Sequence, residues 1–165
     1  MAIHFTVQSM LKESLVEMFL VAEYSINFRK DPALWGFGGC YGYPAAVLLF
    51  SIADSIGSYV NGGNTEKHFN VLNHTDYYDL GLAPDEIKML YQKYRSLLTH
   101  NAVMANEATL SIGDKDSHVF ELQKGVPLLN LLPFLEKTRV ALSNFLEVSD
   151  VVVSNSKQLQ DILKK

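Results

Sequence analysis

The sequence predicts an all-α fold, an up-and-down bundle of about four to six helices with a small β-hairpin insertion. Three observations lead to this fold class. Long segments repeat apolar residues at helical spacing, glycine and proline clusters separate these segments, and residues 109–123 alternate like a pair of strands. The chain has 165 residues, close to the commonest size of one domain, and no repeat or linker divides it. We therefore expect a single domain over residues 1–165.

The first predicted helix covers about residues 6–28 and is amphipathic. Its apolar stripe consists of Leu11, Leu15, Met18, Phe19, Ala22 and Ile26. Charged residues such as Lys12 and Glu17 fall outside the stripe, so one face is expected to pack on other helices. Asp31 and Pro32 end the segment, because the residue before a proline avoids the helical region.

Four glycines alternate with aromatic residues between positions 35 and 43, which predicts a loop. A phosphate-binding loop of the nucleotide-binding type would end in Gly-Lys-Ser/Thr and follow a strand, and the segment has neither feature. The favoured interpretation is a tight loop between helices with its aromatic side chains folded onto the core.

A second predicted helix begins at Pro44, in a first turn that tolerates proline, and reaches about Val60. It is apolar almost all round, which is typical of a helix at the centre of a bundle. A narrow polar stripe crosses it at spacings of three and four, formed by Ser51, Asp54, Ser55 and Ser58. Because a buried carboxylate needs a partner, Asp54 is expected to have one.

Shorter signals predict the remaining elements. A helical piece is expected at about 67–72, and another helix begins at Pro84, where two acids follow in the first turn, and ends near His100. Two short runs with strand character, Thr109–Gly113 and His118–Gln123, predict the hairpin. A long helix is expected at about 131–147 and a last helix at about 155–163.

Composition and charge exclude some classes of protein. The formal net charge is -4, unlike that of a basic protein that coats nucleic acid. The longest apolar run, around residues 45–53, is far shorter than the roughly 20 residues that span a bilayer, so no membrane-spanning segment is expected. Cys40 is the single cysteine and the N-terminus lacks a signal-peptide pattern, so we expect a cytoplasmic protein.

One stretch, Tyr94 to Asn101, combines residues with catalytic potential at the end of a predicted helix. Arg95 and His100 are separated by four residues, and each is followed by a polar residue, Ser96 and Asn101. The stretch resembles the arginine-to-histidine motif of the HEPN superfamily, and the apolar helix that carries Asp54 resembles the acidic helix of that family. The likeness in the order of elements extends over about residues 6–147.

The resemblance implies a helical domain and, in many members, a metal-independent ribonuclease of toxin–antitoxin, phage-defence or RNA-processing systems. It makes Arg95 and His100 the catalytic pair, in a site without metal or cofactor. The supporting residues would be Asp54, Tyr94, Ser96 and Asn101, and the contacts to nucleic acid or another anion would be Lys88 and Lys93. A second copy of the chain, RNA and a partner protein are the implied partners. Two features depart from the family: Ser96 stands where active members often carry asparagine, aspartate or histidine, and the hairpin is not part of the minimal bundle.

The motif residues suit this chemistry. Cleavage of RNA without a metal needs a base for the 2′-hydroxyl proton and a cation beside the phosphate. Histidine titrates near neutrality, and arginine stays charged and offers a planar fork to phosphate. Positions five apart on a straight α-helix are turned by roughly 140°, so Arg95 and His100 of one chain would not face one phosphate. Either the helix ends before His100, or two copies of the chain complete the site.

Other interpretations of these residues stay open. In one alternative, Arg95 neutralises Asp54 or an exposed acid, and His100 merely ends the helix. The domain would then bind a partner protein, a nucleotide or nucleic acid without catalysis. A metal site formed by His68, His74, Asp76 and Asp79 matches no metal-binding spacing. Tyrosines near the motif would stack on bases, although the helical spacing of Tyr91 and Tyr94 favours the core.

Overall fold

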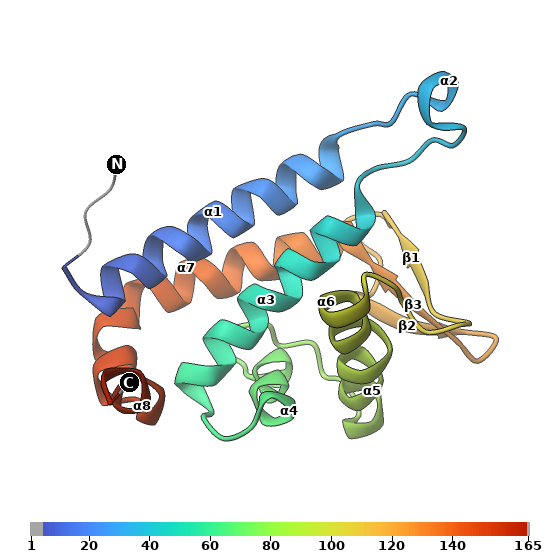
Figure 1. Ribbon diagram of the computed structural model, residues 1–165. Coiled ribbons are helices and arrows are strands. Elements are labelled where there is room, and N and C mark those ends of the chain that lie inside the picture. The colour runs from blue at the N-terminus through green and yellow to red at the C-terminus, as the bar shows by residue number, and fades with distance from the viewer. Residues whose placement is uncertain (1–4, 165) are drawn as a thin grey trace.

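Three long helices form the centre of the structure: α1 (Val7–Asn27), α3 (Gly42–Val60) and α7 (Leu131–Asn155) (Figure 1). The computed structural model describes residues 5–164. Residues 1–4 and 165 lie outside the described residues, and with them most of the N-terminal segment on which the cytoplasmic expectation depends. Each of the three helices packs against the other two. The chain is thus mostly helical, with a small sheet at one end.

α1 buries the face that the sequence predicts. The Thr6 hydroxyl caps the helix by accepting a hydrogen bond from the Ser9 backbone N–H. The stripe residues Leu15, Ala22 and Ile26 are almost completely buried. Since burial of one large aliphatic side chain stabilises the fold by about 1.5–3 kcal/mol, packing of this face, rather than helix propensity, fixes α1 in place.

α3 is the core helix of the structure and packs against both α1 and α7. By length and composition, the 19 residues of this helix are enough to cross a membrane. The uninterrupted apolar run at 45–53 is shorter than the helix and so did not identify this. Half of its most apolar window is buried inside the fold, however, and Leu49, Phe50 and Ile52 have no exposed surface. The position of α3 is therefore that of a core helix rather than of a membrane span.

The glycine-rich segment between α1 and α3 forms an arm that projects beyond the long helices (Figure 1). It carries the short helix α2 (Pro32–Trp35), and the Lys30 N–H closes it by donating to the Gly39 carbonyl at 2.8 Å. The expectation that its aromatic side chains fold onto the core is wrong, because Trp35 and Phe37 are 54% and 61% exposed. The closed arm turns these side chains outward, and Phe37 lies instead beneath the Lys30 ammonium.

The helix that carries the arginine and histidine motif is continuous but not a regular α-helix. It consists of α5 (Pro84–Met89), a π-helical segment η2 (Leu90–Ser96) and α6 (Leu97–Asn101). The short α4 (Thr65–His68) and the 3-10 helix η1 (Phe69–Asn73) precede it and pack against α3. The helix does not end before His100, so the first of the two geometric solutions is wrong. The straight α-helix assumed for the motif is also wrong, because η2 widens the turn.

The sheet has three strands, not the two of the predicted hairpin. β1 (Thr109–Ser111) pairs in parallel with β3 (Val126–Asn130), and β2 (Phe120–Gln123) pairs with β3 antiparallel. The hairpin predicted over residues 109–123 is therefore wrong, since β1 and β2 are not neighbours. The actual hairpin turns at Lys124 and Gly125, which both have positive φ values, 53° and 83°. Such a two-residue turn matches the twist of the adjoining strands.

α7 extends eight residues beyond its predicted end, from about 147 to Asn155. The buried positions continue through Phe145, Ser149 and Val153 at a spacing of four, so the inner face does not stop at residue 147. α8 (Lys157–Leu163) follows, and the Ser156 hydroxyl caps it by accepting from the Leu159 N–H. The last helix is thus close to its predicted place.

Candidate functional site

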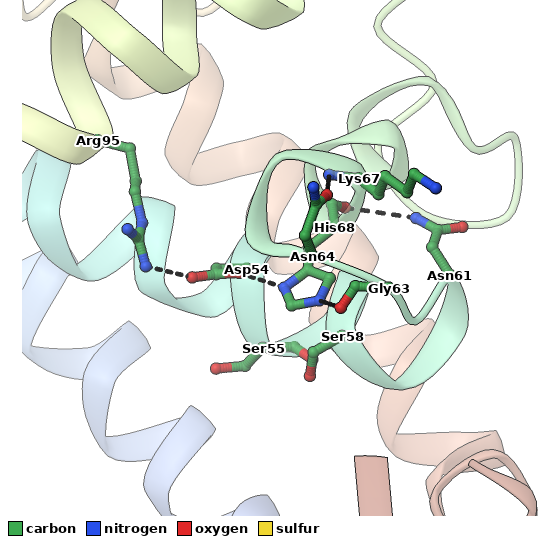
Figure 2. Close-up of polar contacts among 9 residues, drawn as sticks. All are labelled: Asp54, Ser55, Ser58, Asn61, Gly63, Asn64, Lys67, His68 and Arg95. Carbon is green, nitrogen blue, oxygen red and sulfur yellow. Dashed lines mark hydrogen bonds and ion pairs between the residues drawn. The ribbon is translucent and has the colours of Figure 1, made fainter. Parts of the chain in front are cut away.

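Asp54 lies on α3 between two basic side chains that come from different elements (Figure 2). Arg95 of η2 donates from Nη2 to Oδ2 of Asp54 at 2.6 Å. His68, the last residue of α4, places Nδ1 2.7 Å from Oδ1 of the same carboxylate. The three side chains are 17%, 18% and 12% exposed, so the cluster is largely shielded from water. Asp54 therefore has the partner that the sequence predicts, and a second one that it does not.

His68 reaches Asp54 because the backbones of α3 and α4 approach unusually closely at Gly57. A Cβ atom added at Gly57 would lie 2.1 Å from the His68 carbonyl oxygen, closer than atoms can approach. Asn64 caps α4 by accepting from the Lys67 N–H, which sets the orientation of this single turn. Sequence reasoning missed His68 as a neighbour of Asp54. The available signal was Gly57 itself, because glycine inside an apolar helix indicates a close approach.

The second ring nitrogen of His68 faces a carbonyl. Nε2 lies 3.3 Å from the Gly63 oxygen, whereas Nδ1 faces the Asp54 carboxylate. Both neighbours accept hydrogen bonds, so an imidazolium satisfies both contacts and a neutral ring satisfies only one. With both nitrogens occupied inside the fold, His68 orients the Asp54 carboxylate and has no free nitrogen for a substrate.

Among the hydrogen bonds of residues 5–164, Arg95 uses only a small part of its donor capacity. A guanidinium has five N–H donors, and one of them is used by Asp54. The guanidinium carbon also lies 5.8 Å from the centre of the Tyr91 ring, so the cation makes a cation–π contact with this ring. Asp54 and Tyr91 thus hold Arg95 in one orientation, and its remaining donors suit a bidentate contact to a phosphate.

His100 lies one helical turn further along, on α6, and is exposed. Within residues 5–164, neither Asp54 nor Arg95 makes a hydrogen bond or ion pair with it. Asn101, the last residue of α6, is exposed as well, and Ala102 ends the helix in the left-handed conformation. Of the predicted catalytic pair, one member is therefore fixed against α3 and the other projects from the surface.

Tyr94 anchors the motif helix to the sheet. Its side chain is completely buried, and its hydroxyl donates to the carbonyls of Pro127 at 2.8 Å and Thr109 at 3.0 Å. Burial raises the pKa of Tyr94 to about 12, opposed by the hydrogen bond to Thr109. The neighbouring Ser96 is half-buried at the end of η2. Tyr94 thus belongs to the core, as its helical spacing predicts.

The two lysines proposed as nucleic-acid contacts occupy different surroundings. Lys88 is exposed and lines a groove of about 630 Å³ between α4, η1 and α5, whereas Lys93 is half-buried. The groove contains Lys67 and Lys88, but Glu66 and Asp85 as well. With two cations and two acids, the groove has no excess of positive charge to attract a phosphate backbone.

The four residues considered as metal ligands, His68, His74, Asp76 and Asp79, do not form a metal site among the described residues. No group of three or more His, Cys, Asp or Glu side chains within residues 5–164 is arranged to hold a metal ion. His68 is committed to Asp54, and His74 accepts a hydrogen bond from the Asp76 N–H. Cys40, the single cysteine, is a free and buried thiol.

Comparisons with protein-family models, with characterised proteins and with solved structures found no match to this chain.

Proposed function

We propose that this protein is a HEPN-like, metal-independent endoribonuclease in which Arg95 and His100 act at a site completed by two copies of the chain. The proposal includes an up-and-down helical bundle as its fold type and a cytoplasmic toxin or phage-defence role. It rests on the sequence motif and on one structural observation: Asp54 fixes Arg95, and most guanidinium donors make no hydrogen bond within the described part of the chain.

The geometry suits a division of labour between the two motif residues. Arg95, oriented by Asp54, would bind the scissile phosphate and stabilise the charge that builds on it. His100, exposed and without a carboxylate partner among the described residues, would move the proton of the 2′-hydroxyl. The π-helical segment that ends next to Arg95 supports this assignment, because such irregular turns often occur at functional sites.

A second copy of the chain is needed because His100 of the same chain does not join Arg95 and Asp54. In a two-fold dimer the surface that carries His100 of one protomer would face the Arg95 of its partner, and the reverse. Each dimer would then contain two equivalent sites, each built from both chains.

A second candidate function is non-catalytic binding of a partner protein, nucleotide or nucleic acid. The shielding of the Asp54 cluster favours it, since a carboxylate held between Arg95 and His68 is also a common structural ion pair. Ser96, in the place where active members often carry a longer polar residue, favours it as well.

Incubation of the purified protein with labelled RNA in the presence of a chelator distinguishes the two candidates. The ribonuclease proposal predicts cleavage by the wild type and loss of cleavage in the Arg95→Ala, His100→Ala double variant. Binding of RNA or a partner protein without cleavage would favour the second candidate. Equal residual activity in the wild type and the double variant would mean that the nuclease activity is a contaminant.

A further inference from the structure

The arm between α1 and α3, residues 28–41, presents aromatic side chains that the core does not use. Trp35 and Phe37 belong to it and are more than half exposed. The arm is fastened at its base, where the Tyr41 N–H donates to the Ser25 carbonyl at 3.0 Å. Exposed rings gathered on a fixed segment indicate a surface that contacts another molecule.

Ring contacts arrange the aromatic side chains of the arm in one row. Phe28 and Tyr41 stack with their ring centroids 4.6 Å apart and their planes 5° from parallel. Tyr24 of α1 continues the row, 6.0 Å from Phe28. At the other end the Lys30 ammonium lies 5.8 Å from the centre of the Tyr41 ring and 4.7 Å from that of Phe37. The row is therefore held in place before any partner binds, which lowers the entropic cost of binding.

The arm carries two cations, Arg29 and Lys30, and one acid, Asp31. No acid within residues 5–164 forms an ion pair with either cation. Asp31 keeps its charge while it caps α2, so two cations against one acid leave an excess of one positive charge, on a chain whose net charge is -4. An excess of this size suits about one or two phosphates, so ring stacking would supply most of the affinity for a nucleic acid.

A groove of about 370 Å³ lies between the base of the arm and the segment that follows the motif helix. Its lining combines Lys30 and the exposed Tyr43 with Met104 and β1, at the end of the molecule that holds the sheet (Figure 1). Met104 comes four residues after His100. Among the described residues, Lys30 is the single charged side chain of the lining, so no acid there repels a phosphate. The groove thus connects the arm to the part of the chain that carries the proposed base.

We propose that the arm and this groove bind single-stranded RNA, with bases stacked on the exposed rings of Trp35, Phe37 and Tyr43 and the backbone passing Arg29 and Lys30. The strand is single because the faces of bases in a duplex are covered by their neighbours. An apolar protein segment would use the rings but not the unpaired cations beside them, so RNA fits the surface better. The inference rests on the proposed function, since it supplies a place for the strand on which the motif residues would act.

Fluorescence anisotropy with a labelled 2′-O-methyl RNA of about twelve nucleotides tests this proposal. The probe lacks the 2′-hydroxyl that the proposed cleavage needs, so binding is measured without turnover. An abasic strand of the same length is the matched probe, because it keeps the phosphates and lacks the bases. We expect the wild type to bind the 2′-O-methyl strand at least about tenfold more tightly than the abasic strand, the order of one or two stacked bases.

Two kinds of variant separate stacking from charge. The Trp35→Ala, Phe37→Ala double variant should lose about tenfold or more in affinity and keep the salt dependence of binding. Lys30→Gln should instead lower the slope of log affinity against log salt by about 0.7, the share of one phosphate. Val148→Ala with Val151→Ala, which removes exposed apolar groups from α7, is the control and should bind like the wild type. Circular dichroism checks that each variant is folded.

The outcomes distinguish the arm from the catalytic site. Unchanged binding in the Trp35→Ala, Phe37→Ala variant, or equal binding of the abasic strand, would overturn the role of the arm even if the wild type cleaves RNA. Binding that depends on the arm in a protein that never cleaves RNA would support the arm and contradict the ribonuclease. Loss of a dimer in the arm variant with no change in RNA binding would identify a second copy as the occupant and overturn the proposal.

Discussion

Arg95 donates to Asp54 across 2.6 Å and thereby joins two residues that are 41 positions apart in the chain. The contact fastens the motif helix to the core helix α3. Because His68 holds the other carboxylate oxygen, Asp54 connects three helical elements, α3, α4 and η2. The same contact orients Arg95 and stabilises the fold, so the two roles have to be separated by experiment.

Replacement of Asp54 by alanine should destabilise the protein by about 2–3 kcal/mol, because Arg95 and His68 would both be left largely buried without an acceptor. Urea unfolding measures this change. His100→Ala is the matched control, and we expect it to stay within about 0.5 kcal/mol of the wild type because the side chain is exposed. Similar losses in the two variants would mean that the Asp54 cluster contributes little to stability.

Replacement of Gly57 by alanine should be unusually costly for a helical glycine. In most helices this change stabilises by about 0.5–1 kcal/mol, but here the new methyl group would strike the His68 backbone. We expect a loss of about 3 kcal/mol or more in urea unfolding, as α4 is pushed away from α3. Gly38→Ala is the control, since its Cβ would meet only Pro32 at an ordinary 3.6 Å. A neutral Gly57→Ala variant would contradict the close approach of α3 and α4.

The parts of the fold that depend on helical periodicity could be predicted from the sequence. α1 and α3 were found with small errors at their ends, and the partner of Asp54 followed from the need of a buried carboxylate for a cation. The position of His68 could not be predicted, because it depends on how α4 docks on α3. β3 was missed because Pro127 lies inside it and its turn, Lys124 and Gly125, lacks the usual asparagine or aspartate.

Two tyrosine-to-phenylalanine variants compare a buried hydroxyl that donates hydrogen bonds with one that has no hydrogen-bond partner among the described residues. Tyr94→Phe should cost about 1–2 kcal/mol at neutral pH, because the buried carbonyls of Pro127 and Thr109 each lose a hydrogen bond from the Tyr94 hydroxyl. Tyr78→Phe should be neutral or slightly stabilising, since its hydroxyl has no partner to lose among the described residues. Chemical unfolding of both variants checks this order. A larger loss for Tyr78→Phe would show that its hydroxyl is bonded in solution.

The same residue, Tyr94, makes stability depend on alkaline pH. Its folded-state pKa is raised from 10.0 to about 12, so the buried phenol resists ionisation after the unfolded chain has begun to ionise. The contribution of the Tyr94 phenol to the free energy of unfolding is fully present below pH 10 and is lost as the pH rises from 10 toward 12. In unfolding measurements across this pH range, the difference in free energy of unfolding between the wild type and Tyr94→Phe should become smaller. A difference that stays constant would contradict the raised pKa.

Complementation of single variants tests the central claim most directly. Arg95→Ala and His100→Ala are each expected to cleave RNA far more slowly than the wild type. If Arg95 of one chain acts with His100 of its partner, mixing and re-associating the two inactive variants restores one intact site in each mixed dimer. Half of the dimers are then mixed, so activity should return to about a quarter of the wild-type value. Absence of cleavage by the wild type, or no recovery in the mixture, would contradict a shared ribonuclease site.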